Sequence, residues 1–393
     1  MKKRVVVGLS GGVDSSVAAY LLKKQGYEVK ALFMKNWEDQ QGVLTSNCNW
    51  EDDLMFAEMA ANKLDIPLHF VDFSKEYRER VVNYMFEEYK RGRTPNPDVL
   101  CNREVKFDLF AREAEKLGTD YIATGHYCKK KSTRLNGKTI HSLIAGDDSN
   151  KEQSYFLCQI TQEQLSNALF PLGALYKSQV RELASAQGLA TATRKDSQGI
   201  CFVGKVDLPE FLQQKLAPKK GKIIQIPAEP LREYKAELTK NKDLSLQCQA
   251  YDFGMIEGKM VGEHQGAHYF TIGQRKGLNV GGTKEPLYVL ATDTEKNIVY
   301  VGEGQHHPGL YRNGLLIPGA DIHWIRPDLQ LKPGEEQTME FRIRYRQPLQ
   351  RGKLIMKTER AYILFDQPQR GVTPGQFAAW YVEGELLGSG VIS

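Results

Sequence analysis

The most constraining feature of this sequence is a glycine-rich segment that lies directly between a strand and a helix. Residues 4–9 (RVVVGL) form a β-branched, apolar run that predicts a buried strand, and residues 15–24 (SSVAAYLLKK) predict a helix. The segment SGGVDSS, at 10–16, joins them. Glycines let a ligand approach the backbone closely, and N–H groups at a helix N-terminus bind anions. The segment therefore predicts a phosphate-binding loop.

This loop is neither of the two common phosphate-binding motifs. Both G-x-x-x-x-G-K-[ST] and G-x-G-x-x-G are absent from it. A plainer interpretation is a tight turn in which Asp14 or Ser16 caps the following helix. We favour the phosphate site because the whole heptad follows an N-terminal strand.

Strand and helix signals continue to alternate through the first third of the chain. They predict an α/β fold, a Rossmann-like and mostly parallel sheet with helices on both faces. The predicted strands after the first are 28–34, 68–72 and 121–124, and the predicted helices are 51–64, 75–91 and 104–117. From about residue 205 short β-rich runs take over, at 222–226, 268–272, 287–291 and 298–301. After Pro318 short strands with turn signals predict a small β-barrel.

Length and pattern together predict three domains in the 393 residues. We place a catalytic domain with a helical extension at 1–204, a central β-rich domain at 205–310 and the β-barrel at 311–393. No apolar run approaches the roughly 18 residues of a membrane-spanning helix, and the apolar run after the basic N-terminus is too short for a signal peptide. We therefore expect a cytoplasmic protein. The 53 basic and 48 acidic residues give a net charge of +5, a weak hint of a polyanionic partner.

The six cysteines form no C-x-x-C pair, which argues against structural zinc, and a large cytoplasmic chain needs no disulfide framework. In RTPNPDVLCN (93–102) two prolines fix a rigid loop that would hold Asp98 and Cys101 close together near a helix N-terminus. Such a position would lower the pKa of Cys101 and make it a nucleophile, with Asp98 as a proton shuttle. An Asp cap beside a small buried Cys is an equally plain interpretation.

A second cysteine lies in RKDSQGICF (194–202), where Arg194 and Lys195 would favour a thiolate at Cys201. For this motif alone, a buried Cys at a strand edge is the preferred interpretation. The remaining cysteines lack motif context and are expected to be ordinary thiols; they are Cys48, Cys128, Cys158 and Cys248.

Taken together, these motifs resemble those of a known family. SGGVDSS resembles the PP-loop of the ATP pyrophosphatases, which adenylate very different substrates. With RTPNPDVLCN and KDSQGICF, the chain closely resembles the tRNA-specific 2-thiouridylases of the MnmA type. Further matching motifs are MKNW (34–37), ATGHY (123–127), SYFL (154–157) and GQRKGL (273–278), in the order of the family.

The resemblance implies ATP-dependent 2-thiolation of the wobble uridine of tRNA. The C2 oxygen would be adenylated, and a persulfide on Cys201 would deliver the sulfur. Cys101 would attack that persulfide, forming a Cys101–Cys201 disulfide, or hydrosulfide would be released first; Asp98 would transfer a proton. The resemblance also implies ATP with Mg²⁺, a tRNA, a sulfur-relay persulfide donor protein, no membrane and a monomer.

The family motifs also carry binding residues over to this chain. The nucleotide site would comprise Gly8, Leu9, Ser10, Gly11, Gly12, Val13, Asp14, Ser15, Met34 and Gly125. The target base would contact Asn96, Pro97 and Asp98, and the tRNA would contact His126, Lys151, Glu152, Gln153, Arg344, Tyr345 and Gln376. Arg342, Arg344 and Arg346 alternate, which predicts one strand face.

Some features stay open. The family usually has Asp at the position of Glu152. The stretch near 228–257 looks longer than usual, and we interpret it as a solvated excursion; an extra tRNA or partner contact through Lys235, Lys240 and Lys242 is the alternative. The run at 129–131 (KKK) is either solvated or in contact with phosphate. Two rival functions are another adenylating PP-loop enzyme and a non-catalytic RNA-binding or thiol-switch protein.

Overall fold

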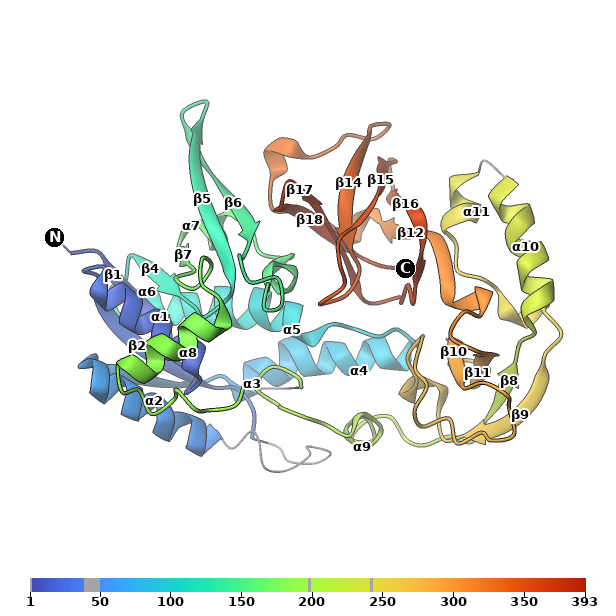
Figure 1. The fold of residues 1–393 in the computed structure, drawn as a ribbon, viewed down its shortest axis with the longest axis horizontal. Coiled ribbons are helices and arrows are strands. Elements are labelled where there is room, and N and C mark those ends of the chain that lie inside the picture. The colour runs from blue at the N-terminus through green and yellow to red at the C-terminus, as the bar shows by residue number, and fades with distance from the viewer. Residues whose placement is uncertain (1, 39–49, 197–198, 241–242) are drawn as a thin grey trace.

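The N-terminal part of the chain forms the predicted parallel sheet with helices on both faces. The computed structural model describes residues 2–38, 50–196, 199–240 and 243–393 (Figure 1). The sheet has the strand order β3-β2-β1-β4-β7, and all of its pairings are parallel. Its strands are β1 (Arg4–Gly8), β2 (Glu28–Lys35), β3 (Leu68–Asp72), β4 (Tyr121–Ala123) and β7 (Ala168–Leu169).

The central strand of this sheet is buried on both faces, as its β-branched run predicts. Val5 and Val7 pack in one core with residues of α1, α2 and α8, whereas Val6 packs in a second core with residues of α4 and α6. The helices concerned are α1 (Val13–Lys24), α2 (Trp50–Leu64), α4 (Asn83–Lys90), α6 (Phe110–Lys116) and α8 (Lys177–Ala186). The α/β expectation is therefore confirmed.

Two long helices on the second face each contain a wide, π-helical segment. The first comprises α3 (Ser74–Tyr77), η1 (Arg78–Val82) and α4; the second comprises α5 (Pro97–Leu100), η2 (Cys101–Leu109) and α6. The predicted helix at 104–117 thus begins earlier, at Pro97, where Asn96 caps it by accepting a hydrogen bond from Val99 N. Cys101 consequently lies inside a helix and not in the loop before it.

The central domain is a small four-stranded sheet with the order β10-β11-β8-β9. Its strands are β8 (Gly221–Gln225), β9 (Lys259–His264), β10 (Leu287–Asp293) and β11 (Ile298–Glu303). The strand predicted at 268–272 is wrong, because a short 3₁₀ helix, η5 (Ala267–Tyr269), begins there. Side chains hold this segment in place of a strand partner: Asn297 accepts from Ala267 N, and Tyr269 donates to Leu216 O.

Much of the stretch near 228–257 is exposed, as the interpretation of a solvated excursion expects, but part of it packs into the protein. It folds into α10 (Ala228–Lys240) and α11 (Leu244–Cys248), and Leu231 and Cys248 are fully buried. Lys235 donates to Pro308 O within the central domain and to Tyr311 O, the first residue of the predicted barrel domain. Lys242 lies outside the described residues. The remaining short helices are α7 (Gln162–Ser166), α9 (Leu208–Leu212), η3 (Ser154–Leu157), η4 (Phe253–Met255), η6 (Pro308–Leu310), η7 (Gly319–Asp321) and η8 (Pro327–Leu329).

The C-terminal barrel shares its sheet with a hairpin from the N-terminal part of the chain. The order is β12-β16-β15-β14-β17-β18-β6-β5, and β13 also pairs with β18. The join is short, with Leu386 opposite Leu143 and Glu385 opposite Ile144. The strands are β5 (Cys128–Leu135), β6 (Lys138–Ala145), β12 (Tyr311–Pro318), β13 (Ile322–Trp324), β14 (Glu336–Arg342), β15 (Gln350–Met356), β16 (Arg360–Arg370), β17 (Phe377–Val382) and β18 (Glu385–Val391).

The three alternating arginines lie at and after the end of strand β14 in the barrel. Strand β14 ends at Arg342, and Arg346 has a positive φ of 62°, so the three alternating arginines do not share a strand face. The predicted common face was wrong because the chain turns directly after Arg342.

In the described part of the chain, no helix has the length and apolar character needed to cross a bilayer.

Candidate active site

The glycine-rich loop has the geometry of an open helix N-terminus. Strand β1 ends at Gly8, and Gly12 is the N-cap of α1 without any side-chain cap. Gly11 has a φ of +72°, and a Cβ there would lie 2.1 Å from Asp53 O. The side chain of Ser15 fixes the loop: it accepts from Ser10 N at 3.1 Å and donates to Gly12 O at 3.1 Å. The first N–H groups of α1 are therefore left for an anion.

The alternative in which Asp14 or Ser16 caps the helix does not hold. Ser16 Oγ donates to Gly12 O at 2.9 Å, so it serves a carbonyl and not the free N–H groups. The Asp14 carboxylate instead accepts from Tyr127 Oη at 2.6 Å and lies 2.7 Å from Lys177 Nζ. Both side chains are thus occupied elsewhere.

The other predicted nucleotide residues lie around this loop at the carboxyl edge of the sheet. Gly125 follows β4, and a Cβ there would come within 3.0 Å of Asp14 and of Ser15 N. The end of the Met34 side chain lies 3.7 Å from the position of a Cβ on Gly8. The predicted nucleotide residues therefore lie together at the edge where open parallel sheets bind ligands.

A cluster of charges links the loop to the segment that carries Cys201. Asp196 lies 2.8 Å from Lys177, 2.5 Å from Lys151 and 2.8 Å from Arg181. Burial opposes the ionisation of Asp196, but the hydrogen bonds from Lys151 and Lys177 outweigh it and lower its pKa to about 2. Because Lys177 also binds Asp14, Asp196 and the glycine-rich loop share one cation.

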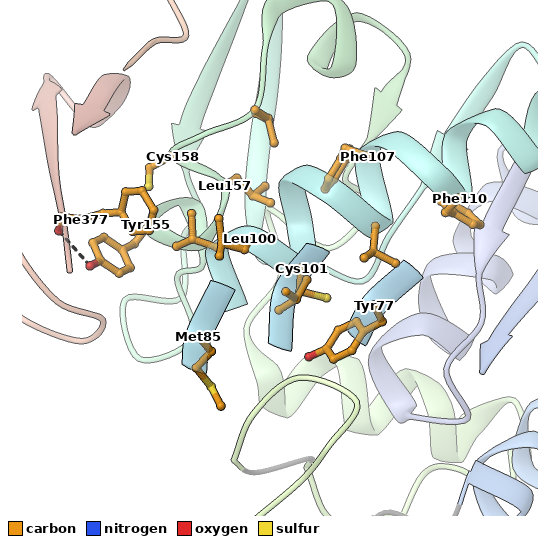
Figure 2. Packing of buried hydrophobic residues seen from close by; sticks show 14 of the residues in the cluster. Tyr77, Met85, Leu100, Cys101, Phe107, Phe110, Tyr155, Leu157, Cys158 and Phe377 are labelled. Atoms are coloured by element: carbon orange, nitrogen blue, oxygen red, sulfur yellow. Dashed lines mark hydrogen bonds between the residues drawn. The ribbon is translucent and has the colours of Figure 1, made fainter. Parts of the chain in front are cut away.

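The two cysteine motifs meet, although they are far apart in the sequence. The Cys101 and Cys201 side chains lie close enough to interact, and both are free cysteines. The Cys201 backbone is held on both sides: its N–H donates to Asp98 Oδ1 at 2.9 Å, and its carbonyl accepts from Tyr77 Oη at 2.6 Å. Figure 2 shows Cys101 and Tyr77 next to each other in the core between the long helices.

The pair is electrostatically asymmetric. The interaction with the Cys101 side chain contributes most to lowering the pKa of Cys201 to about 7. The positive charge of Lys106 acts in the same direction, and burial opposes both. Burial raises the pKa of Cys101 well above its usual value. Burial also raises the pKa of Asp98, although Cys201 N and Lys106 both favour its carboxylate. Cys201 is thus the more acidic thiol of the pair.

Two predictions about these thiols were wrong. The pKa of Cys101 is not lowered, because Cys101 is buried inside the helix and not at its end. Arg194 does not stabilise a Cys201 thiolate either, because it donates to Gly11 O at 2.8 Å and to Asp53 at 2.6 Å. The cation beside the thiols is Lys106, whose Nζ lies 5.5 Å from the Phe202 ring centroid. Lys106 follows Cys101 by five residues. In a π-helix, whose hydrogen bonds join residues five apart, this spacing brings the two residues near each other, but the sequence does not reveal the π-helical segment.

A cavity of about 460 Å³ opens beside Asp98. The C-terminal barrel closes one side, because Gln376 Nε2 donates to Thr94 O at 3.0 Å and its Oε1 accepts from Asn96 at 3.4 Å. The lining residues include the whole predicted target-base segment; they are Pro95, Asn96, Pro97, Asp98, Gly199, Ile200, Lys205, Val206 and Gln376.

Comparisons with known proteins agree with this arrangement. Residues 3–205 match the family described as "tRNA methyl transferase HUP domain", 246–303 its "PRC-barrel domain" and 316–392 an "Aminomethyltransferase beta-barrel domain". A "tRNA-specific 2-thiouridylase MnmA" of Flavobacterium johnsoniae is 57% identical, covering 100% of both chains. One of Christiangramia forsetii is 56% identical, also with 100% coverage of both. The chain belongs to the MnmA family of tRNA-specific 2-thiouridylases.

A solved structure with weaker similarity is a "4-thiouridine synthetase - RNA complex with bound ATP". It is 18% identical, has a TM-score of 0.35, and the match covers 60% of this chain and 53% of that one. These values are too low to support a functional comparison.

The MnmA resemblance assigns several residues to tRNA, and they fall into two groups. The side chains of the first group lie in the protein interior. Glu152 has a side chain only 5% exposed, which accepts from Ser154 N and pairs with Arg342. Gln153 hydrogen-bonds to both backbone groups of Tyr127. His126 is buried with its Nδ1 2.7 Å from Thr124 Oγ1, and burial lowers its pKa well below its usual value, so it is neutral.

The second group lies toward the surface. Arg344 is exposed, and Tyr345 packs against Phe156 with ring centroids 4.3 Å apart. Lys151 is partly exposed beside Asp196. No cluster of three His, Cys, Asp or Glu side chains that could hold a metal occurs among the described residues. Cys48, Ser197 and Gln198 lie outside those residues.

Proposed function

We propose that this protein is an ATP-dependent tRNA sulfurtransferase that 2-thiolates the wobble uridine. One observation carries the proposal: Cys101 and Cys201 lie close together beside Lys106 and Asp98, and Asp98 also lines the cavity that contains the predicted base-binding segment. The glycine-rich loop lies at the same side of the molecule, linked through Lys177 and Asp196.

The loop suits the pyrophosphate end of ATP. The uncapped N–H groups of α1 supply donors, and the Lys177 ammonium adds positive charge to the site. In the first step the uridine C2 oxygen attacks the α-phosphorus, and pyrophosphate leaves. Mg²⁺ would enter with the nucleotide, because phosphates and water supply most of its usual ligands. Residues at 8–15, Met34 and Gly125 form the proposed nucleotide site.

The asymmetry of the two thiols suits the sulfur steps. The Cys201 thiolate attacks the outer sulfur of a donor protein's persulfide, and the donor leaves as a thiolate. The persulfide of Cys201 then attacks C2 of the adenylated uridine, and AMP leaves. Cys101 finally attacks the Cys201 sulfur: the S–S bond to the uridine sulfur breaks, 2-thiouridine is released and a Cys101–Cys201 disulfide forms. A thiol reductant must restore the pair. Release of hydrosulfide before its attack on C2 is the alternative order.

Asp98 is the proposed proton acceptor for Cys101. A buried thiol with a raised pKa needs a base before it can attack, and the raised pKa of Asp98 makes its carboxylate a stronger base than an exposed one. Asp98 also lines the cavity, where an unstacked uridine would bind between Asn96, Pro97 and Gln376. We further propose that the protein acts as a monomer in the cytoplasm, where tRNA, ATP and reduced thiols are available.

The test uses unmodified tRNA, ATP, Mg²⁺ and a persulfide donor, with 2-thiouridine measured by mass spectrometry. Cys201→Ser should still release pyrophosphate with tRNA but form no 2-thiouridine. Cys248→Ala, which removes a buried thiol remote from the site, is the control and should keep activity. Pyrophosphate release without any need for tRNA would favour another adenylating enzyme, and none under any condition would favour an RNA-binding or thiol-switch protein.

A further inference from the structure

The β5–β6 hairpin concentrates the positive charge of the chain. Between Asp120 and Asp147 the sequence contains no acidic residue. The hairpin alone carries five basic residues, so its charge equals the net +5 of the whole chain. They are Lys129, Lys130, Lys131, Arg134 and Lys138. The rest of the molecule is therefore neutral on balance.

Two of these five charges are used inside the protein. Lys129 pairs with Asp147 at 2.5 Å, and Lys130 donates to Ser166 O at 2.8 Å. The other three, Lys131, Arg134 and Lys138, are exposed, and no acidic side chain among the described residues pairs with them. Exposed basic side chains without acidic neighbours are available to an external anion.

The hairpin is a defined arm. Its register is continuous from Cys128 opposite Ala145 to Leu135 opposite Lys138, and Asn136 and Gly137 close it with φ values of 48° and 78°. Positive φ at both turn residues matches the twist of a two-residue hairpin. Its base is anchored, because β6 pairs with β18 and Gln162 of α7 hydrogen-bonds to both backbone groups of His141. Figure 1 shows the arm extending away from the parallel sheet, beside the barrel.

The arm begins at the proposed active site and leads away from it. Strand β5 starts at Cys128, directly after Tyr127, whose hydroxyl binds Asp14 of the glycine-rich loop. At about 3.3 Å per residue, its seven steps to Leu135 span roughly 23 Å. Lys131 lies three steps, roughly 10 Å, along this strand, and Arg134 and Lys138 lie near its far end. The arm thus extends away from the site, toward the backbone of a folded RNA bound there.

Basic residues on an edge strand have a plainer explanation. Strand β5 is the last strand of its sheet, and lysine on an exposed edge prevents pairing with another chain. That role is satisfied by charge of either sign, and it does not account for Arg134 and Lys138 beside the turn or for the absence of acidic residues along the arm. Complementarity to a polyanion accounts for the lysines on the edge strand, for Arg134 and Lys138 beside the turn, and for the absence of acidic residues.

We propose that the β5–β6 arm binds the sugar–phosphate backbone of the tRNA, away from the reacting nucleotide. This inference rests on the proposed function, in which a tRNA is the substrate. Because phosphate contacts position a nucleic acid without reading its sequence, the arm contributes to affinity and not to the chemical steps. Its contribution should also weaken as salt rises, since bound phosphates release counterions.

The test compares two variants with the same change in net charge. The arm variant is Lys131→Gln/Arg134→Gln/Lys138→Gln. The control variant, Lys2→Gln/Lys24→Gln/Lys63→Gln, removes three exposed charges at the opposite edge of the sheet, before β1 and in the last turns of α1 and α2. Binding of an unmodified tRNA transcript is measured over a range of KCl concentrations, together with KM and kcat for thiolation. Thermal melting checks that both variants fold.

The arm variant should lower the slope of log K against log salt by about 2 to 3, since each phosphate contact contributes roughly 0.7 to 0.9. Its KM for tRNA should rise at least about tenfold with kcat unchanged at saturating tRNA, and the control should match the wild type. An unchanged slope in the arm variant, or equal losses in both variants, would overturn the role of the arm alone. Wild-type protein that binds no tRNA would overturn both this role and the proposed function. Arm-dependent binding to phosphatidylserine vesicles with unaltered tRNA binding would assign the arm to a membrane instead.

Discussion

Lys106→Met is the substitution that most directly tests how this site activates a thiol. Lys106 is the cation that acts on Cys201, chiefly through its charge. Methionine has nearly the same length and keeps the packing against Phe202, over whose ring the ammonium lies at 5.5 Å. The substitution therefore removes the charge while largely preserving the shape of the side chain.

The size of the effect follows from the two pKa values. With a pKa of about 7 in the protein, against 9.0 for the free thiol, roughly three quarters of Cys201 would be thiolate at about pH 7.5. The interaction with Cys101 is the larger influence and remains in the variant, so we expect a rise of about one pKa unit, or about 1.4 kcal/mol. Thiolate would then fall to about a quarter, and alkylation should slow about threefold at that pH.

The assay is the pH dependence of iodoacetamide labelling, with the Cys201 peptide quantified by mass spectrometry. Buried Cys101 should label more slowly, because its pKa is raised and its side chain is inaccessible. Lys106→Arg keeps the charge and serves as the control, with a midpoint close to that of the wild type. A folded Lys106→Met protein whose labelling midpoint matches the wild type would refute the assignment of Lys106 as the activating cation.

Three further substitutions probe the loop, the charge cluster and the barrel contact. Asp196→Asn should be less stable than the wild type at neutral pH; because the Asp196 pKa is lowered to about 2, the difference in urea midpoint should persist above about pH 4 and shrink as the pH falls through about 2. Gly11→Ala forces a Cβ to within 2.1 Å of a backbone oxygen, so calorimetry should show at least about tenfold weaker ATP binding, whereas Gly281→Ala, with open space around it, should bind normally. Glu152→Ala leaves Arg342 without its buried partner and should lower the free energy of unfolding by about 3 to 5 kcal/mol. Weaker tRNA binding by Glu152→Ala without any loss of stability would instead support a direct tRNA contact.

The sequence by itself determined the features that depend on local patterns. The strand at 4–9, the glycine-rich turn and the helix that follows need only β-branched residues, backbone freedom at Gly11 and a helical period, all within one short segment. The alternation of strands and helices predicted the parallel sheet for the same reason. The two cysteine motifs also identified Cys101 and Cys201 as the reactive candidates, because each motif is itself a short segment.

The tertiary structure decided everything that depends on which distant segments meet. Lys106, and not the neighbouring Arg194, acts on Cys201, because the helix and the loop come together only in the fold. Glu152 is buried because a strand nearly two hundred residues later supplies Arg342. The β5–β6 arm completes the sheet of a barrel formed by the other end of the chain. Charge pairing, burial and the pKa values that follow from them are set by distances in space, and a local sequence pattern does not encode those distances.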